Sequence, residues 1–226
     1  MIITIDGPVA SGKSTIAKML AIKLNYYYLN TGFLYRAIAY LLVKYFNFTL
    51  ADLSNPKLET LTKCLDEILN LLKYEFKNGE VFIWYNGKNI APFLKNLEID
   101  DAASRISQIS LVRNLLSPIQ KNIGLSHNLV AEGRDCGTKI FPEAEFKFFL
   151  DADILIRADR WYQDQIKKKN NISLEEALNY VKMRDLRDTE RKIAPLLKSD
   201  DALIIDSSTK SVEEIIIELS KFINRT

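Results

Sequence analysis

The chain has 226 residues, which suits one α/β domain with an insertion, and its 47% hydrophobic and 27% charged residues are ordinary for a globular protein. Its formal net charge is only +2, which excludes a strong overall field for nucleic acid or membranes, so any anion site must be local. The two cysteines, Cys64 and Cys136, form no CxxC pair, which disfavours a disulfide framework and fits a reducing compartment.

The first elements alternate between strand and helix patterns. Residues 2–6 are a short β-branched run that ends in Gly-Pro, and this pattern predicts a buried strand. The pattern next predicts a helix, a second strand and another helix, at residues 13–24, 26–29 and 32–46. Asn30 or Thr31 can serve as the N-cap of the last of these helices.

The middle of the chain has a different character. Residues 56–72 show the pattern of an amphipathic helix. Asn78-Gly79 and Asn86-Gly87 then interrupt residues 74–90, and Asn-Gly between apolar runs is the strongest short-range signal for a hairpin. Two such turns predict a three-stranded antiparallel meander, which favours a separate subdomain inside an otherwise parallel α/β chain.

The remainder returns to alternating helices and strands. Helices are predicted at residues 97–106, 111–123, 154–169, 174–183 and 211–223. Strands are predicted at residues 129–131, 146–150 and 202–205. Together with the first two strands, these give five short strands that alternate with helices. We therefore expect a five-stranded parallel sheet flanked by helices on both faces.

A complete phosphate-binding motif follows the first strand. Residues 7–14 match GxxxxGK[ST], in which glycines let the backbone N–H groups wrap a phosphate and the following helix directs its positive end at it. Lys13 would reach the β- and γ-phosphates of ATP, and the Ser14 hydroxyl would ligate Mg²⁺. The predicted ATP-binding residues of this loop are Gly7, Pro8, Val9, Ala10, Ser11, Gly12, Lys13, Ser14 and Thr15.

Other motifs limit the reaction. The chain has no NKxD motif of switch GTPases and no LSGGQ-like signature of transport ATPases. Hydrolytic ATPases usually place a second acid after the strand-end aspartate, but here Asp151 is followed by Ala152. Asp151 would either touch the metal through water or cap the next helix. Transfer to an acceptor is therefore favoured over hydrolysis.

Arginines suggest that the acceptor carries a phosphate. Four charged residues are spaced to share one helix face: Arg184, Arg187, Asp188 and Arg191. Taken alone, they could be a solvated face balanced by nearby acids. Arg36 and Arg134 add two more guanidinium groups, which suit phosphate oxygens. Phosphoryl transfer depends on positioning and charge neutralisation, so this set favours a kinase for a phosphorylated acceptor.

These segments resemble those of bacterial cytidylate kinases over essentially the whole chain. Besides the phosphate loop, the matching blocks are NTGFLYR at residues 30–36, AAS at 102–104, VR at 112–113, EGRDCGT at 132–138 and RDLRDTER at 184–191. The resemblance implies ATP- and Mg²⁺-dependent phosphorylation of CMP and dCMP. It departs from the family pattern at Asn30, where an aspartate is usual, and at Phe33, where a small residue is common.

The resemblance also implies roles for individual residues. The residues that would hold the CMP phosphate are Arg36, Arg134 and Arg184. Those that would read the cytosine edge are Ser104, Arg113 and Asp135. Asp188 would contact the ribose near Thr31, and Arg191 would approach the transferred phosphoryl group. Arg157 and Arg160 are the candidates for the ATP phosphates. The implied catalytic residues are Lys13, Arg134, Arg184 and Arg191.

The chemistry of cytosine supports these base readers. Its N4 amino group can donate a hydrogen bond to a carboxylate such as Asp135, whereas N3 and O2 can accept hydrogen bonds from Arg113 or Ser104. Uracil has a carbonyl at position 4, which would face the same carboxylate without a hydrogen bond. An unpaired buried carboxylate costs a few kcal/mol, so a large preference for CMP over UMP is expected.

The family fold implied is a five-stranded parallel core with an NMP-binding insertion and a short lid. The expected core comprises residues 1–30, 108–156 and 192–226, the NMP-binding lobe residues 31–107 with the meander near 74–90, and the lid residues 157–191.

Two other functions remain open from the residues alone. One is a kinase for another small metabolite, such as a shikimate-like acid, and the other is a nucleotide-binding regulator or RNA-binding module.

The N-terminus lacks the basic region of a signal peptide, and the apolar runs are far shorter than the ~20 residues of a membrane span. We therefore expect a cytoplasmic monomer whose partners are CMP and dCMP, with no nucleic acid and no membrane.

Overall fold

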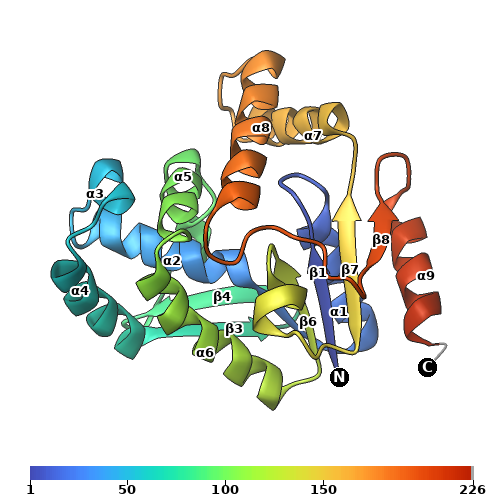
Figure 1. The fold of residues 1–226 in the computed structure, drawn as a ribbon, viewed down its shortest axis with the longest axis horizontal. Coiled ribbons are helices and arrows are strands. Elements are labelled where there is room, and N and C mark those ends of the chain that lie inside the picture. The colour runs from blue at the N-terminus through green and yellow to red at the C-terminus, as the bar shows by residue number, and fades with distance from the viewer. Residues whose placement is uncertain (225–226) are drawn as a thin grey trace. The chain divides into compact units, whose positions relative to one another are not determined.

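The computed structural model describes residues 1–224 (Figure 1). The chain divides into two compact units, of which the first comprises residues 1–27 and 127–226 and the second residues 28–126. Among the described residues, every helix is too short or too polar to cross a membrane. The expected functional division into core, lobe and lid stays a prediction.

The larger sheet has five strands, as the sequence predicts. Across the sheet they follow the order β2 (Tyr27–Asn30), β6 (Leu129–Gly133), β1 (Ile2–Asp6), β7 (Phe146–Asp151) and β8 (Leu203–Asp206). Strand β1 pairs in parallel with β6 and β7, and β7 pairs in parallel with β8. Because the carboxyl ends of parallel strands meet at one edge, the segments that follow β1, β6 and β7 gather there.

Helices cover this sheet because its strands are apolar on both faces. Ile3 and Ile5 of β1 are fully buried, as is Leu129 of β6. Helix α1 (Lys13–Leu24) contacts β6 and also α9 (Val212–Ile223). The bounds of α1 are those predicted, and Ser211 caps α9 with the help of Glu214.

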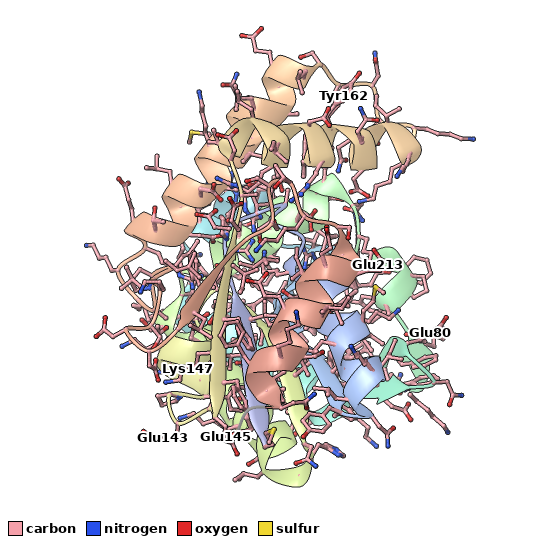
Figure 2. All side chains as sticks on the ribbon, turned by 90° about the vertical axis from the view of Figure 1, so that its right-hand side faces the viewer. Glu80, Glu143, Glu145, Lys147, Tyr162 and Glu213 are labelled. Atoms are coloured by element: carbon pink, nitrogen blue, oxygen red, sulfur yellow. The ribbon has the colours of Figure 1, made fainter. Side chains whose placement is uncertain are left out.

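An antiparallel helix pair, α7 (Ile154–Lys167) and α8 (Leu174–Glu190), completes the first unit. The rings of Trp161 and Tyr180 stack between them at 4.1 Å. Figure 2 places Tyr162 of α7 at one end of this unit and Glu143 and Glu145, which precede β7, near the opposite end. The pair therefore lies beyond the carboxyl edge of the sheet, beside the phosphate-binding loop.

Helix α8 corrects two expectations. It runs to Glu190 instead of ending at residue 183, so Arg184, Arg187 and Asp188 are helical. Arg191 is the C-cap and has extended backbone, with φ −60° and ψ 137°, so it leaves the helix face that the spacing predicts. Its guanidinium group donates a hydrogen bond to the Ala194 carbonyl oxygen, in the segment that follows the helix.

The second unit contains the predicted antiparallel meander. Its strands are β3 (Leu72–Lys77), β4 (Glu80–Tyr85) and β5 (Lys88–Asn89). All four turn residues have positive φ, as a two-residue type I′ hairpin requires: Asn78, Gly79, Asn86 and Gly87. The helices are α2 (Thr31–Lys44), α3 (Leu50–Ser54), α4 (Leu58–Leu71), α5 (Leu97–Ile106) and α6 (Ser110–Ser126).

Three short elements were not predicted. Helix α3 forms because Thr49 and Asp52 make a reciprocal capping box. A 3₁₀ turn occupies Ala91–Phe93, and a π-helical turn occupies Cys136–Ile140 after β6. None of them contains a long periodic pattern, so their formation depends on individual side-chain contacts.

Candidate functional site

The phosphate-binding loop joins the end of β1 to the start of α1. A Cβ on Gly7 would lie 2.1 Å from the Leu150 carbonyl oxygen, so only glycine lets the chain leave β1 so close to β7. Gly12, the N-cap of α1, has φ 91° and no side chain to cover the helix N-terminus. The loop therefore has the open backbone that binding of a phosphate group requires.

Lys13 is buried within this loop. Its ammonium group donates a hydrogen bond of 2.8 Å to the Pro8 carbonyl oxygen. The pKa of Lys13 is lowered to about 7, first by burial and then by the positive charge of Arg134, while Glu132, Asp188 and Asp185 oppose the change. The loop lysine is thus within the field of Arg134 and Asp188, from two blocks that are distant in sequence.

The acid nearest to the expected metal ligand is Glu132. The Ser14 hydroxyl donates to a Glu132 carboxylate oxygen at 2.7 Å, and Glu132, near the end of β6, is almost fully buried. Sequence reasoning assigned Glu132 no role, because it sought the acid at the end of β7. The available signal was its place at the end of a buried strand, inside the EGRD block. These two oxygen donors fit Mg²⁺, which usually takes one or two protein ligands and completes its shell with water and phosphate oxygens.

One of the two roles considered for Asp151, capping of α7, is wrong, and its contact to a metal through water stays a prediction. Asp153 is the N-cap of α7 and accepts from the Leu155 N–H, which corrects the prediction that Asp151 caps this helix. The Asp151 carboxylate instead accepts from the adjacent Ala152 N–H. Within residues 1–224 there is also no cluster of three or more His, Cys, Asp and Glu side chains that could bind a metal.

A network of ion pairs joins the EGRD block to the end of α8. Arg134 donates to Asp188 at 2.7 Å, and Arg191 donates to Asp135 at 3.3 Å. Arg191 also lies 3.9 Å from Asp188 and donates to the Ala194 carbonyl oxygen. Burial by itself would raise the pKa of Asp188, but the nearby arginines outweigh it and hold that pKa below its usual value. Four of the predicted acceptor-site residues are therefore brought together, and Arg184 acts on the same carboxylate.

Arg157 contacts the phosphate-binding loop directly. It donates to the Val9 carbonyl oxygen at 3.2 Å and forms an ion pair with Asp185 of α8. Asp185 in turn accepts from the Val9 N–H at 3.1 Å. Sequence reasoning did not single out Asp185, because its charge looked like part of a solvated helix face.

Arg160 reaches the loop through another residue. Its guanidinium group donates to the Ser207 carbonyl and hydroxyl oxygens, and the Ser207 hydroxyl donates to the Ser11 carbonyl oxygen at 2.9 Å. Ser207 follows β8 and is almost fully buried. No sequence pattern indicated this serine, which the order of strands in the sheet brings to the loop.

The second unit positions the other predicted acceptor residues. Arg113 is buried, donates to the Ser107 carbonyl oxygen at 2.6 Å and lies over the Tyr35 ring. The Ser107 hydroxyl donates to the Ser104 carbonyl oxygen, so Ser104 and Arg113 share one support. The Ser104 hydroxyl is buried and has no hydrogen-bond partner among the described residues. It is therefore able to bind a ligand group.

Helix α2 carries the other two residues of this set. Asn30 caps the helix by accepting from the Phe33 N–H at 3.1 Å, which places Thr31 at the first helical position. Arg36, one turn later, pairs with Asp100 of α5 at 2.6 Å. The substitution of asparagine for the expected aspartate leaves this capping bond intact.

Comparison with known proteins identifies relatives over the full chain. A sequence model of the family described as cytidylate kinase matches residues 3–225. The cytidylate kinase of Thermosipho africanus is 41% identical over 95% of this chain and 90% of its own length. Cytidylate kinase 1 of Haemophilus influenzae is 38% identical over 100% of this chain and 94% of its own length.

A solved structure shows the same fold at low identity. An uncharacterized protein from Eubacterium ventriosum aligns with a TM-score of 0.51 and 15% identity, covering 100% of this chain and 99% of that one.

Proposed function

The chain belongs to the cytidylate kinase family, and from that premise we propose that it transfers the γ-phosphoryl group of ATP to CMP or dCMP, forming CDP or dCDP and ADP. The observation that carries the proposal is the network of Arg134, Asp135, Asp188 and Arg191, in which the charges of Arg134 and Asp188 act on Lys13 of the phosphate-binding loop. A phosphate donor site and a cluster of acceptor arginines in one field are what phosphoryl transfer requires.

On the donor side, the open loop backbone and Lys13 bind the ATP phosphates, and the guanidinium group of Arg157 adds a second positive charge beside Val9. Arg160 supports the loop through Ser207 and Ser11. Ser14 and Glu132 would hold Mg²⁺, which would supply positive charge beside the ATP phosphates when it is bound.

On the acceptor side, we assign the CMP phosphate to Arg36, Arg134 and Arg184. Arg191 neutralises charge that develops on the transferred group. Asp188 and Thr31 are both assigned to the ribose, and the low pKa of Asp188 keeps it ionised as a hydrogen-bond acceptor. Asp135, Arg113 and the Ser104 hydroxyl read the cytosine edge.

The test is a panel of acceptors with Mg-ATP, followed by release of ADP. CMP and dCMP should give the highest kcat/KM, and UMP, AMP, GMP and shikimate much lower values. A clear advantage for any of the last four would overturn the assignment. Shikimate turnover would favour a kinase for another small metabolite, and ADP release independent of any acceptor would indicate hydrolysis.

Two variants test the assigned roles. Lys13→Ala should abolish turnover for every acceptor, whereas Lys23→Ala, an exposed lysine on the same helix, should leave it unchanged. Asp135→Ala should lower the CMP-over-UMP ratio of kcat/KM by about 10- to 100-fold, because a lost hydrogen bond to a buried charged group is worth roughly 1.5–3 kcal/mol. Undiminished turnover in Lys13→Ala would refute the role of the loop.

The proposed compartment is the cytoplasm, and the proposed working form is a monomer. Cys64 and Cys136 form no disulfide, which fits a reducing environment.

A further inference from the structure

The carboxylate of Asp6 is a buried group that has no part in the chemistry assigned above. Asp6 is the last residue of β1, directly before the phosphate-binding loop, and only 4% of it is exposed. One of its oxygens accepts from the Cys136 N–H at 2.9 Å, and the other accepts from the Gly137 N–H at 2.7 Å. A single carboxylate therefore connects the start of the donor loop to the segment that follows Asp135.

Those two N–H groups belong to the start of the π-helical turn at Cys136–Ile140. The first N–H groups of a helical turn have no partner within the turn, and the residue before it usually supplies one. That residue is Asp135, but its side chain makes no capping hydrogen bond and pairs with Arg191 instead. Asp6 thus performs the capping from a different strand, which leaves the Asp135 carboxylate available for other contacts.

The turn is also pressed closely against β1. A Cβ on Gly137 would lie 2.9 Å from the Thr4 hydroxyl oxygen and 3.5 Å from an Asp6 carboxylate oxygen. The Thr4 hydroxyl is buried and has no hydrogen-bond partner among the described residues, so it fills space without bonding to the turn. Of the Thr4 and Asp6 side chains of β1, only that of Asp6 therefore forms hydrogen bonds with the turn.

Keeping a carboxylate here has a cost. The pKa of Asp6 is raised to about 6, mainly by burial and also by the nearby Asp135, while the two N–H groups oppose the rise. The ionised form alone offers an acceptor to both N–H groups at once. An amide at this position would present a donor to one of them.

We propose that Asp6 is a positioning residue that fixes the Arg134–Asp135 segment relative to the phosphate-binding loop and so sets the binding and selection of CMP. This inference rests on the proposed function, because it concerns the same acceptor site. It predicts that damage to the Asp6 contacts appears mainly in the acceptor parameters.

The first test compares Asp6→Asn with Thr4→Val. The amide is nearly isosteric with the carboxylate but loses one acceptor. The KM for CMP should therefore rise about 10- to 100-fold, and the CMP-over-UMP ratio should fall. The KM for ATP should change by less than about threefold. Thr4→Val is made in the same strand and removes a hydroxyl that makes no hydrogen bond. It should change neither KM by more than about twofold.

Amide hydrogen exchange gives a readout that does not depend on turnover. Exchange in residues 134–140 should become faster in Asp6→Asn and stay unchanged in Thr4→Val, because only the first variant loses the cap. A variant that merely unfolds more easily would keep its KM for CMP and its selectivity. That outcome, or equal increases in the KM values for ATP and CMP, would overturn the inference.

A second test approaches the turn from the other side, in case Asp6→Asn does not fold. Gly137→Ala should raise the KM for CMP, because the added methyl group must displace the turn from Thr4. The double variant Thr4→Ala/Gly137→Ala should recover part of the loss, and Thr4→Ala alone serves as its control. An unchanged KM for CMP in Gly137→Ala would contradict the inference.

Failure of the inference is distinct from failure of the proposed function. If the unaltered chain does not phosphorylate CMP, the proposed function fails, and the role given to Asp6 fails with it. If the unaltered chain phosphorylates CMP and the Asp6 and Gly137 variants keep its KM, only the role of Asp6 is refuted.

Discussion

At the scale of single residues, Lys13 shows how the fold prepares a side chain for an anion. The ammonium group is removed from water and donates a hydrogen bond to the Pro8 carbonyl oxygen. Its pKa of about 7 means that Lys13 is only partly protonated at neutral pH when no ligand is bound. The phosphates of ATP would supply the missing negative charge and stabilise the protonated form.

This predicts proton uptake when ATP binds. A lysine with a lowered pKa is protonated below that pKa and loses its charge as the pH rises through about 7, so at pH 8 most Lys13 is neutral. If bound phosphates restore its usual pKa, ATP binding at pH 8 takes up nearly one proton, and the uptake disappears near pH 6. Calorimetric titration of ATP in buffers of different ionisation enthalpy measures the number.

Lys13→Arg is the matched control. A guanidinium group remains protonated throughout this pH range, so the variant should bind ATP without the extra uptake at pH 8. Equal uptake in the variant and the unaltered chain would show that another group takes the proton.

At the scale of elements, regular local patterns predicted some elements correctly, whereas other boundaries depended on individual side-chain contacts. The Asn-Gly turns and the apolar periodicity of α1 and α5 are local signals, and these elements form where they were predicted. The cap of α7 and the end of α8 were predicted incorrectly, because several polar residues near each boundary could have served as the capping residue. The choice between Asp151 and Asp153 depends on which side chain faces the first N–H groups of the helix.

Helix α6 contains a polar residue that the sequence pattern does not explain. Gln120 is fully buried, and neither polar atom of its side chain has a hydrogen-bond partner among the described residues. An unsatisfied buried polar group costs about 1–3 kcal/mol. Gln120→Met, which keeps an unbranched chain of similar length, should therefore raise the free energy of unfolding by about 1–2 kcal/mol. Urea denaturation measures this change.

An exposed glutamine provides the control for that measurement. Gln108→Met lies in the segment between α5 and α6 and should change the free energy of unfolding by less than about 0.5 kcal/mol. A loss of stability in Gln120→Met would show that the amide has a partner that stabilises the fold.

At the scale of the whole molecule, charge is balanced and concentrated only locally. The chain has 31 basic and 29 acidic residues, and several arginines of the proposed site are already paired with Asp188, Asp135, Asp185 or Asp100. Paired arginines attract a small phosphate that can displace or join the carboxylate, but they give little long-range attraction for a polyanion.

This predicts no useful affinity for nucleic acid. A fluorescently labelled single-stranded RNA should show no change in anisotropy with up to ~10 µM protein at ~150 mM salt. Micromolar binding that weakens steeply as salt increases would instead favour the RNA-binding alternative. Acceptor-dependent ADP release in the same preparation is the positive control for an intact protein.

The sequence by itself determined the parts of this protein that depend on neighbouring residues. The phosphate-binding loop is continuous, so residues 7–14 and the flanking strand and helix suffice to predict it. The five-stranded sheet and the meander likewise follow from alternation and turn residues. The family blocks indicated the arginines and aspartates of the acceptor site, although their roles stay predictions.

Only the tertiary structure decided which of these residues meet. Ser14 and Glu132 are 118 positions apart, Asp6 and Cys136 are 130, and Val9 and Asp185 are 176. Spacing along the chain carries no information about such pairs, because they depend on the order of strands in the sheet and on the path of the chain after α8. Burial then shifts the pKa values of Lys13 and Asp6, which reflect groups packed around them and not their neighbours in sequence.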